Sequence, residues 1–412
     1  MLTTRLTAVL THPVQYYAPW FRYISAHAPE LELTVLYGTE PTPEQQGVGF
    51  GKPFQWDVPL TEGYRSTTVR KARRGDRVDS ESFFGLNVQE IDEALEQTHP
   101  DVVLVPGWYS ITLVRALMSA RRHHVPVLFR GDTNLNSGPR RGWQRALWRA
   151  RSRFLLSWFD GYLCPGTLTR EYLESMGVDR SRIAMVPHAI DNAFFADAAR
   201  PFQSRVERAA ARDGFGLTAD GFVMLFVGKL DEVKRPLDVI RAASRLSPRA
   251  SVLMVGGGQL EKECREEAEK LGVAAVFTGF LNQSALGKAY ACADVLVLPS
   301  ASETWGLVVN EALACGRPVV ASSAVGCVPD LVDSQTGDTF ACGDIDALAA
   351  AVARVRARAS IHRYSEACRT RVSRFDFAAA TTGLIHACRQ AMSDRRVHAA
   401  LPLPSGNKEA AR

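Results

Sequence analysis

Two glutamates, Glu303 and Glu311, stand eight residues apart around a glycine-bearing turn, in the segment PSASETWGLVVNEALACGRP that covers residues 299–318. The apolar residues before this segment predict a buried strand, and those after Gly306 predict a helix. The turn therefore opens onto a helix N-terminus, where free N–H groups and the helix dipole favour a diphosphate. One carboxylate would reach sugar hydroxyls and the other the paired hydroxyls of a ribose. The segment thus predicts a sugar-nucleotide site.

The competing interpretation is one exposed loop glutamate and one glutamate on a helix surface, with no ligand. Two glutamates at this spacing have that meaning in most sequences, because the spacing alone is not specific. Here the preceding strand, the turn residues and Gly306, which lets the backbone approach a ligand closely, favour the binding site.

A second segment with matching chemistry is FVMLFVGKLDEVKRPLDVIRAA, residues 222–243, in which a strand is followed by Gly228, Lys229 and Leu230, and Lys234 opens a helix. Together the two segments resemble the retaining glycosyltransferases of family 4, which have the two-domain GT-B architecture. The resemblance covers residues 183–393 well and the first 180 residues in outline.

In that family two basic residues hold the donor diphosphate, and the resemblance gives these roles to Lys229 and Lys234. Lys229 stands where arginine is usual, which keeps the charge but loses the planar fork, so we expect binding to survive with lower affinity. Arg235 stands where glycine is common. It either compensates as a third cation or faces solvent, and both interpretations stay open.

The resemblance also implies a mechanism: the sugar is transferred with retention, and the departing phosphate takes the acceptor proton. Glu303 would orient the donor sugar, Glu311 would bind the ribose, and Phe280 and Leu281 would contact the base. The two lysines and the backbone amides near Gly306 would stabilise the leaving diphosphate, which removes the need for a divalent metal or a cofactor. The expected donor-site residues are Gly228, Lys229, Lys234, Phe280, Leu281, Glu303, Thr304, Trp305, Gly306, Leu307 and Glu311.

Two other motifs indicate ligands that the sequence does not favour. The glycines at residues 256–258 suggest a dinucleotide fingerprint, but no correctly spaced third glycine follows, so NAD binding is not expected. Asp344 and Asp346 have the D-x-D spacing that other glycosyltransferases use for a metal. Because they precede an alanine-rich helix, a helix N-cap is the favoured role.

The first half contains several apolar runs that alternate with helical patterns, which predicts a parallel sheet of the α/β class. The expected fold is therefore GT-B, with two Rossmann-like parallel-sheet domains that face a cleft. Ligands bind at the carboxyl edge of such sheets, so the residues that follow the first strand and the run VPVLFRGD are candidates. His12 is a candidate catalytic or leaving-group contact, or it bonds a neighbouring loop. The candidate acceptor contacts are Gln15, Tyr16, Arg130 and Asp132, and Arg130 either pairs with Asp132 or meets a phosphate.

The expected organisation is an acceptor-binding domain over residues 1–196, a linker over 197–221 with some helix, and a donor-binding domain over 222–375. Asp191 is expected to have a structural role near the passage between the domains. A helix over 376–393 would cross back to the first domain, and 394–412 would be a disordered tail.

The amino-acid composition indicates the compartment in which the protein is expected. The eight cysteines lie mostly in apolar surroundings and predict small core residues in a reducing compartment. No secretion signal or membrane span is indicated, so the cytoplasm is expected. Ten basic residues and one acid lie between Arg115 and Arg153, interleaved with tryptophans. This basic segment either contacts an anionic membrane, at its inner face, or is a partly buried helix with a solvated basic face.

The sequence predicts transfer of a sugar from a nucleoside diphosphate, with uridine favoured over guanosine, to a hydroxyl of a glycan or lipid-linked acceptor. Nucleic acid is not an expected partner, because no recognised module accompanies the basic charge. Two alternatives remain: an epimerase of sugar nucleotides with the same fold, and a non-catalytic protein that binds nucleotide sugars. The first would form product without any acceptor.

Overall fold

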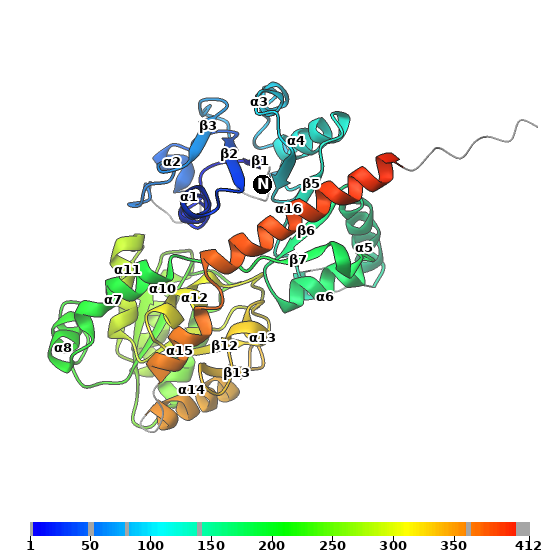
Figure 1. Cartoon of the computed structure of the whole chain (residues 1–412). Coiled ribbons are helices and arrows are strands. Elements are labelled where there is room, and N and C mark those ends of the chain that lie inside the picture. Colours follow the sequence, from blue (N-terminus) through cyan, green and yellow to red (C-terminus); the bar gives the residue numbers. More distant parts are fainter. Residues whose placement is uncertain (1–2, 48–52, 79–81, 138–141, 360–363, 401–412) are drawn as a thin grey trace, which may run out of the picture.

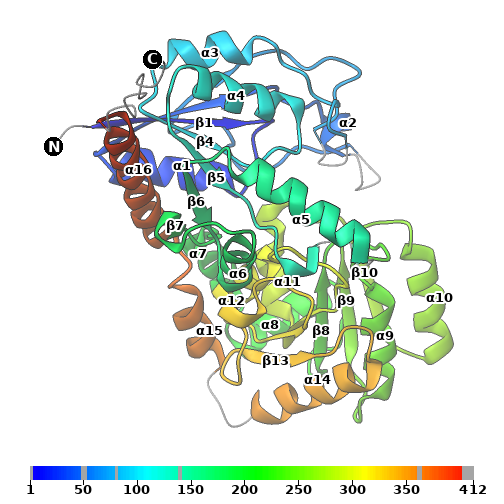
Figure 2. The same ribbon diagram turned by 90° about the vertical axis from the view of Figure 1, so that its right-hand side faces the viewer.

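The computed structural model describes residues 3–47, 53–78, 82–137, 142–359 and 364–400, and of residues 359 and 394–400 it describes the backbone. The chain forms two α/β domains, each built on one parallel sheet with helices on both faces (Figures 1 and 2). The strand orders are β3-β2-β1-β4-β5-β6-β7 and β10-β9-β8-β11-β12-β13. The expected pair of parallel-sheet domains is therefore confirmed.

The strands of the first domain are β1 Thr4–Leu10, β2 Leu31–Tyr37, β3 Arg65–Thr68, β4 Val102–Val105, β5 Val127–Arg130, β6 Gly161–Cys164 and β7 Ile183–Met185. Its helices are α1 Tyr17–His27, α2 Pro43–Gln46, α3 Ile91–Gln97, α4 Ile111–Arg122, α5 Gly142–Leu156 and α6 Thr167–Ser175. Helices on both faces bury the central strands completely, which explains why β4 reads VVLV without a polar residue.

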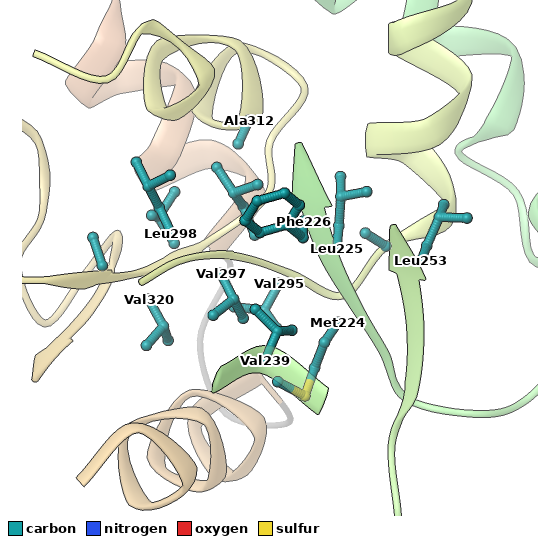
Figure 3. Packing of buried hydrophobic residues seen from close by; sticks show 14 of the residues in the cluster. Met224, Leu225, Phe226, Val239, Leu253, Val295, Val297, Leu298, Ala312 and Val320 are labelled. Carbon is teal, nitrogen blue, oxygen red and sulfur yellow. The ribbon is translucent and has the colours of Figure 1, made fainter. Parts of the chain in front are cut away.

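The strands of the second domain are β8 Val223–Val227, β9 Ser251–Val255, β10 Ala275–Gly279, β11 Val295–Leu298, β12 Val319–Ser322 and β13 Gly337–Phe340. Its helices are α7 Asn192–Ala199, α8 Arg205–Asp213, α9 Pro236–Arg245, α10 Glu261–Leu271, α11 Gln283–Cys292, α12 Leu307–Ala314, α13 Val328–Leu331, α14 Ile345–Ala359 and α15 Tyr364–Val372. Side chains of the strands, such as Phe226 and Val295, and of the helices that cover them, such as Val239 of α9, fill the core (Figure 3).

The passage between the domains lies earlier than the sequence predicted. Ala189 packs in the core of the first domain and Ile190 in the core of the second. Helix α7 and the predicted linker 197–221, which contains α8, also pack on the second domain, because Phe195 and Leu217 are buried in its core. Asp191 caps α7, since its Oδ1 accepts a hydrogen bond of 2.9 Å from the backbone N of Phe194. Its structural role is as expected.

Helix α16, Phe377–Ala400, returns the chain to the first domain (Figure 1). Leu384 and Cys388 are buried in the core of that domain. The helix continues to Ala400, so the predicted start of a tail at residue 394 is wrong; the added segment is rich in alanine and arginine, which are strong helix formers. The rest of the predicted tail lies outside the described residues.

The glycines at residues 256–258 have a packing role. A Cβ atom on Gly256 would lie 1.9 Å from the carbonyl oxygen of Gly228, so only glycine lets the loop after β9 lie directly against the loop after β8. The same contact occurs beside Leu230, where a Cβ atom on Gly258 would lie 2.4 Å from the backbone oxygen. These glycines therefore bring together two loops that end neighbouring strands.

Most cysteines are buried, and the basic segment is divided among several elements. Seven of the eight cysteines are buried and Cys342 is exposed, in line with the expected core role. The segment from Arg115 to Arg153 is not one helix: α4 and α5 are separated by β5, and Arg130 is buried. Arg140 and Arg141 lie outside the described residues. Within the described part of the chain, every helix is too short or too polar to span a bilayer.

Candidate functional site

A cleft of about 750 Å³ lies between the two domains. Its walls are the loops that follow β1, β4 and β5 in the first domain and β8 and β11 in the second. Each of these loops leaves the carboxyl end of a parallel strand, which is where α/β sheets bind ligands. The cleft brings together these predicted residues: His12, Tyr16, Arg130, Asp132, Gly228, Lys234, Glu303, Thr304, Trp305, Gly306 and Leu307.

The second-domain side of the cleft carries an ion pair between Lys234 Nζ and Glu303 Oε2. The loop after β8 holds Lys234 in place, because its backbone N donates to Asp231 Oδ1 at 2.9 Å. Glu303 lies in the loop after β11, and both side chains are partly buried. A cation and a carboxylate therefore face the same part of the cleft.

Helix α12 begins beside this pair. Its N-cap residue is Gly306, whose φ of 101° is unfavourable for residues with a side chain, and no side chain caps the helix. A Cβ atom there would also lie 3.2 Å from Leu298 and Val325. The backbone of the first turn is thus open toward the cleft next to Lys234, and the helix dipole adds positive potential there.

Five predicted residues, Gln15, Lys229, Phe280, Leu281 and Glu311, are not among those that line this cleft. The ring of Phe280 lies 4.4 Å from that of Phe54 and 6.1 Å from that of Trp56, both on the first domain. Beside it, Asn282 Nδ2 donates to the carbonyl oxygen of Gln55 at 2.6 Å. The loop predicted to contact the base therefore contacts the first domain.

Glu311 is buried under two tyrosines. Tyr16 Oη donates to its Oε1 at 2.9 Å, and Tyr290 Oη donates to its Oε2 at 2.6 Å. Only 1% of Glu311 is exposed. Hydroxyl groups thus occupy both carboxylate oxygens that were expected to bind ribose hydroxyls, and one of them comes from the opposite domain.

This burial predicts a pH effect on stability. Burial raises the pKa of Glu311 to about 7, although the hydrogen bonds from Tyr290 and Tyr16 act in the opposite direction. The folded chain therefore binds the Glu311 proton more tightly than the unfolded chain does. The contribution of this proton to the free energy of unfolding is full below about pH 4.5 and is lost as pH rises through 7. When the pH rises from 5 to 8, the free energy of unfolding of the wild type should fall by on the order of 2 kcal/mol more than that of Glu311→Gln. Urea unfolding at both pH values measures this, and an equal loss in both proteins would contradict it.

The first-domain side of the cleft contains a cluster of polar side chains that the sequence only partly predicted. Arg130 does not pair with Asp132: its guanidinium donates to the carbonyl oxygens of Val186 and Pro187 and to His188 Nδ1 at 3.3 Å. It also lies 4.5 Å above the ring of Trp20. Arg130 is the last residue of β5 and is 4% exposed, and it lines the cleft where it holds His188.

His188 lies between Arg130 and Asp132. Because arginine can only donate, His188 Nδ1 is the acceptor, and Nε2 then carries the proton and faces Asp132 Oδ2 at 3.7 Å. Burial lowers the pKa of His188, and the neighbouring Asp132 opposes this. Burial alone would raise the pKa of Asp132, but His188 and the hydroxyl of Thr304 outweigh it and hold the pKa below its usual value. The pair is thus a neutral imidazole beside a carboxylate.

Asp132 also joins the two domains, because Thr304 Oγ1 donates to its Oδ2 at 2.6 Å. His12 lies on the same side of the cleft, with its Nδ1 at 3.0 Å from Thr11 Oγ1. Burial lowers the pKa of His12 to about 4, so this imidazole is neutral near pH 7 and a weak base.

The remaining wall of the cleft is aromatic and was missed in the sequence. Trp108 and Tyr109 follow β4, and Trp148 lies on α5 against Tyr172 of α6, with ring centroids 5.6 Å apart. Flat apolar surfaces with nearby polar groups suit the faces of sugar rings. Only the position of Trp108 at the carboxyl end of a strand could have suggested this in advance.

The D-x-D pair has a structural role. Asp344 Oδ1 accepts from the backbone N of Ala347 at 2.9 Å and caps α14, while Asp346 pairs with Arg245 at 2.6 Å. The favoured helix-cap interpretation of Asp344 is therefore confirmed. Within the described ranges, no three His, Cys, Asp or Glu side chains gather as a metal site requires.

Two family profiles match, one for each domain. "Glycosyltransferase Family 4" matches residues 31–194, and "Glycosyl transferases group 1" matches residues 207–369. Two facing parallel-sheet domains with a ligand cleft between them define the GT-B class. The chain belongs to the GT-B glycosyltransferases of family 4 type.

Curated relatives carry related names. D-inositol 3-phosphate glycosyltransferase 2 of Catenulispora acidiphila is 36% identical over 197 residues, 44% of this chain and 44% of the relative. Sulfoquinovosyl transferase SQD2 of Arabidopsis thaliana is 36% identical over 167 residues, 39% of this chain and 32% of the relative. The chain spans about half or less of the length of such relatives.

Solved structures agree on the fold. Sucrose-phosphate synthase from Thermosynechococcus elongatus matches with a TM-score of 0.70 and 19% identity, over 95% of this chain and 100% of that chain. Anabaena Alr3699/HepE in complex with UDP matches with a TM-score of 0.70 and 14% identity, over 94% and 100%. These likenesses confirm the predicted GT-B fold.

Proposed function

We propose that the protein transfers a sugar from a nucleoside diphosphate, UDP first and GDP second, to a hydroxyl of a glycan, glycolipid or other acceptor, with retention and without a metal. The observation that carries this proposal is the Lys234–Glu303 pair beside the open N-terminus of α12 in the interdomain cleft. The similar Anabaena protein is described with UDP and with UDP-glucose, which supports uridine.

In this proposal the second domain binds the donor. Lys234, Lys229 and the amides that follow Gly306 stabilise the negative charge that grows on the leaving diphosphate, which is the role that a metal ion has in other transferases. Glu303 orients the donor sugar. Phe280 and Leu281 receive the base and Glu311 the ribose, which requires Tyr16 to release Glu311 and the loop around Phe280 to separate from Phe54.

The first domain binds the acceptor in the same proposal. His12, Tyr16, Asp132 and His188 surround the polar part of its cleft wall, and Trp108 and Trp148 form the aromatic part. We place the reaction in the cytoplasm, with a peripheral contact to the inner face of an anionic membrane.

The proposal predicts how nucleotides affect thermal unfolding. The melting temperature should rise by several degrees with UDP at about 100 times its dissociation constant, which adds roughly 2.7 kcal/mol of stability. The shift should be the same with EDTA and with magnesium. GDP, ADP, dTDP and NAD are the comparison ligands. A shift with GDP alone would correct the base, whereas a shift only with NAD, or only with magnesium, would contradict the proposed donor site.

A further inference from the structure

Helix α5 exposes an apolar stripe. Trp143, Leu147 and Phe154 are 70%, 65% and 60% exposed, although side chains of this size are usually covered. Their spacing of four and seven residues places all three on one side of the helix, and Ala150 falls on the same line. Ser152 and Leu156, on the opposite side, are buried. The stripe therefore points away from the core of its own domain.

The charge of α5 has one sign. The helix contains four arginines and no acidic residue. Arg149 and Arg153 donate to the carbonyl oxygens of Ser175 and Met176, which fixes their side chains without neutralising their charge. Arg145 and Arg151 are exposed. An apolar stripe flanked by arginines is the composition of helices that lie in the surface of an anionic bilayer, where tryptophan is also favoured.

The same helix forms part of the cleft wall. Trp148, Arg151 and Ser152 line the cleft, and Arg151 lies between the cleft side of the helix and the stripe. Figure 2 shows α5 running along the first domain toward the second. Whatever covers the stripe therefore lies beside the mouth of the cleft.

We propose that the stripe of α5 rests on an anionic lipid surface and that the cleft receives its acceptor from that surface, so that the acceptor is a lipid-linked molecule. The acceptor part of this inference rests on the proposed transfer of a sugar, whereas the lipid contact does not depend on that reaction. Arg151 is placed to meet a phosphate or carboxylate of such an acceptor, and Trp148 to stack on its sugar.

The test is sedimentation of the full chain with vesicles. The wild type is expected to pellet with vesicles of phosphatidylglycerol and phosphatidylcholine, and to stay in solution with phosphatidylcholine alone. The variant Trp143→Ser, Leu147→Ser and Phe154→Ser should bind at least tenfold more weakly. Its fold should be kept because all three side chains are more than half exposed. Val206→Ser is the matched control, at an apolar residue of the other domain that is 79% exposed, and should bind like the wild type.

A charge variant, Arg151→Glu, changes an exposed arginine beside the stripe and should also weaken binding to the anionic vesicles, and more strongly at low salt. Three results would overturn the proposal. The wild type could stay in solution with anionic vesicles, or the triple variant could pellet like the wild type. In the third result the wild type is a dimer in solution and the triple variant is a monomer. The last result would assign the stripe to a second copy of this chain.

Melting with UDP separates this inference from the proposed function. A triple variant that loses vesicle binding but keeps the UDP shift supports the role of α5. A wild type that binds vesicles but shows no melting shift with any nucleoside diphosphate would contradict the donor site and the lipid-linked acceptor, and would leave only the lipid contact.

Discussion

Glu303→Gln is expected to lower turnover about 100-fold while the dissociation constant of UDP changes by less than about threefold. Glutamine keeps the size of the side chain and can still accept from Lys234, so the diphosphate site should persist. The carboxylate charge that would hold the donor sugar in its reactive orientation is lost. A small misplacement of the reacting atoms is enough to lower turnover about 100-fold. The effect therefore falls on the reaction and not on nucleotide binding.

Initial rates with saturating UDP-sugar, combined with calorimetric titration of UDP, separate these two effects. The matched control is Glu261→Gln, which changes a carboxylate that pairs with Arg265 on the outer surface of α10. It should leave both quantities unchanged. Loss of UDP binding in the Glu303 variant would show that this residue has a role in diphosphate binding that the present assignment excludes.

Lys234→Ala is expected to have the opposite signature, with UDP binding weakened by roughly 10- to 100-fold. A hydrogen bond between charged groups contributes about 1.5–3 kcal/mol, and here the partner would be the diphosphate. Truncation also leaves Glu303, which is partly buried, without its counter-charge, so this carboxylate would repel the incoming phosphates.

Calorimetric titration of UDP against the Lys234 variant measures the loss directly. Lys262→Ala, an exposed lysine on α10, is the control for the removal of one positive charge and should bind UDP as the wild type does. The weakened binding of the Lys234 variant should recover in part in the double variant with Glu303→Gln, because the repelling carboxylate is then removed. An unchanged UDP affinity in Lys234→Ala would assign the diphosphate to Lys229 and the helix amides alone.

The sequence predicted the elements whose hydrophobic pattern is continuous. β4 and β11 are buried on both faces, so each is an unbroken apolar run. β3, with the sequence RSTT, was missed because it is an exposed edge strand that needs no apolar face. The end of α16 was missed because polar, helix-forming residues also suit a tail.

The site was predictable only where its residues lie in one short motif. Glu303 lies in the turn, Gly306 is the N-cap of α12 and Leu307 is its first residue, and all three line the cleft. The bond between Tyr16 and Glu311 joins residues 295 positions apart, and no spacing rule relates such residues. His188 and Trp148 were likewise missed as cleft residues, because they reach the cleft through the packing of β7 and α5 and not through a local pattern.

Within the residues that the structure describes, the chain passes between its domains twice, at residues 189–190 and again between Phe375 and Phe377. The two passages are neighbours, because Asn192 Nδ2 donates to the carbonyl oxygen of Val372 at 3.2 Å. Two adjacent covalent connections would make a movement of one domain against the other a hinge rotation near these residues. Such a rotation would separate Tyr16 from Glu311 and Asp132 from Thr304, which lie across the cleft. A single proteolytic cut in either passage would leave the two halves joined, while freeing them to twist.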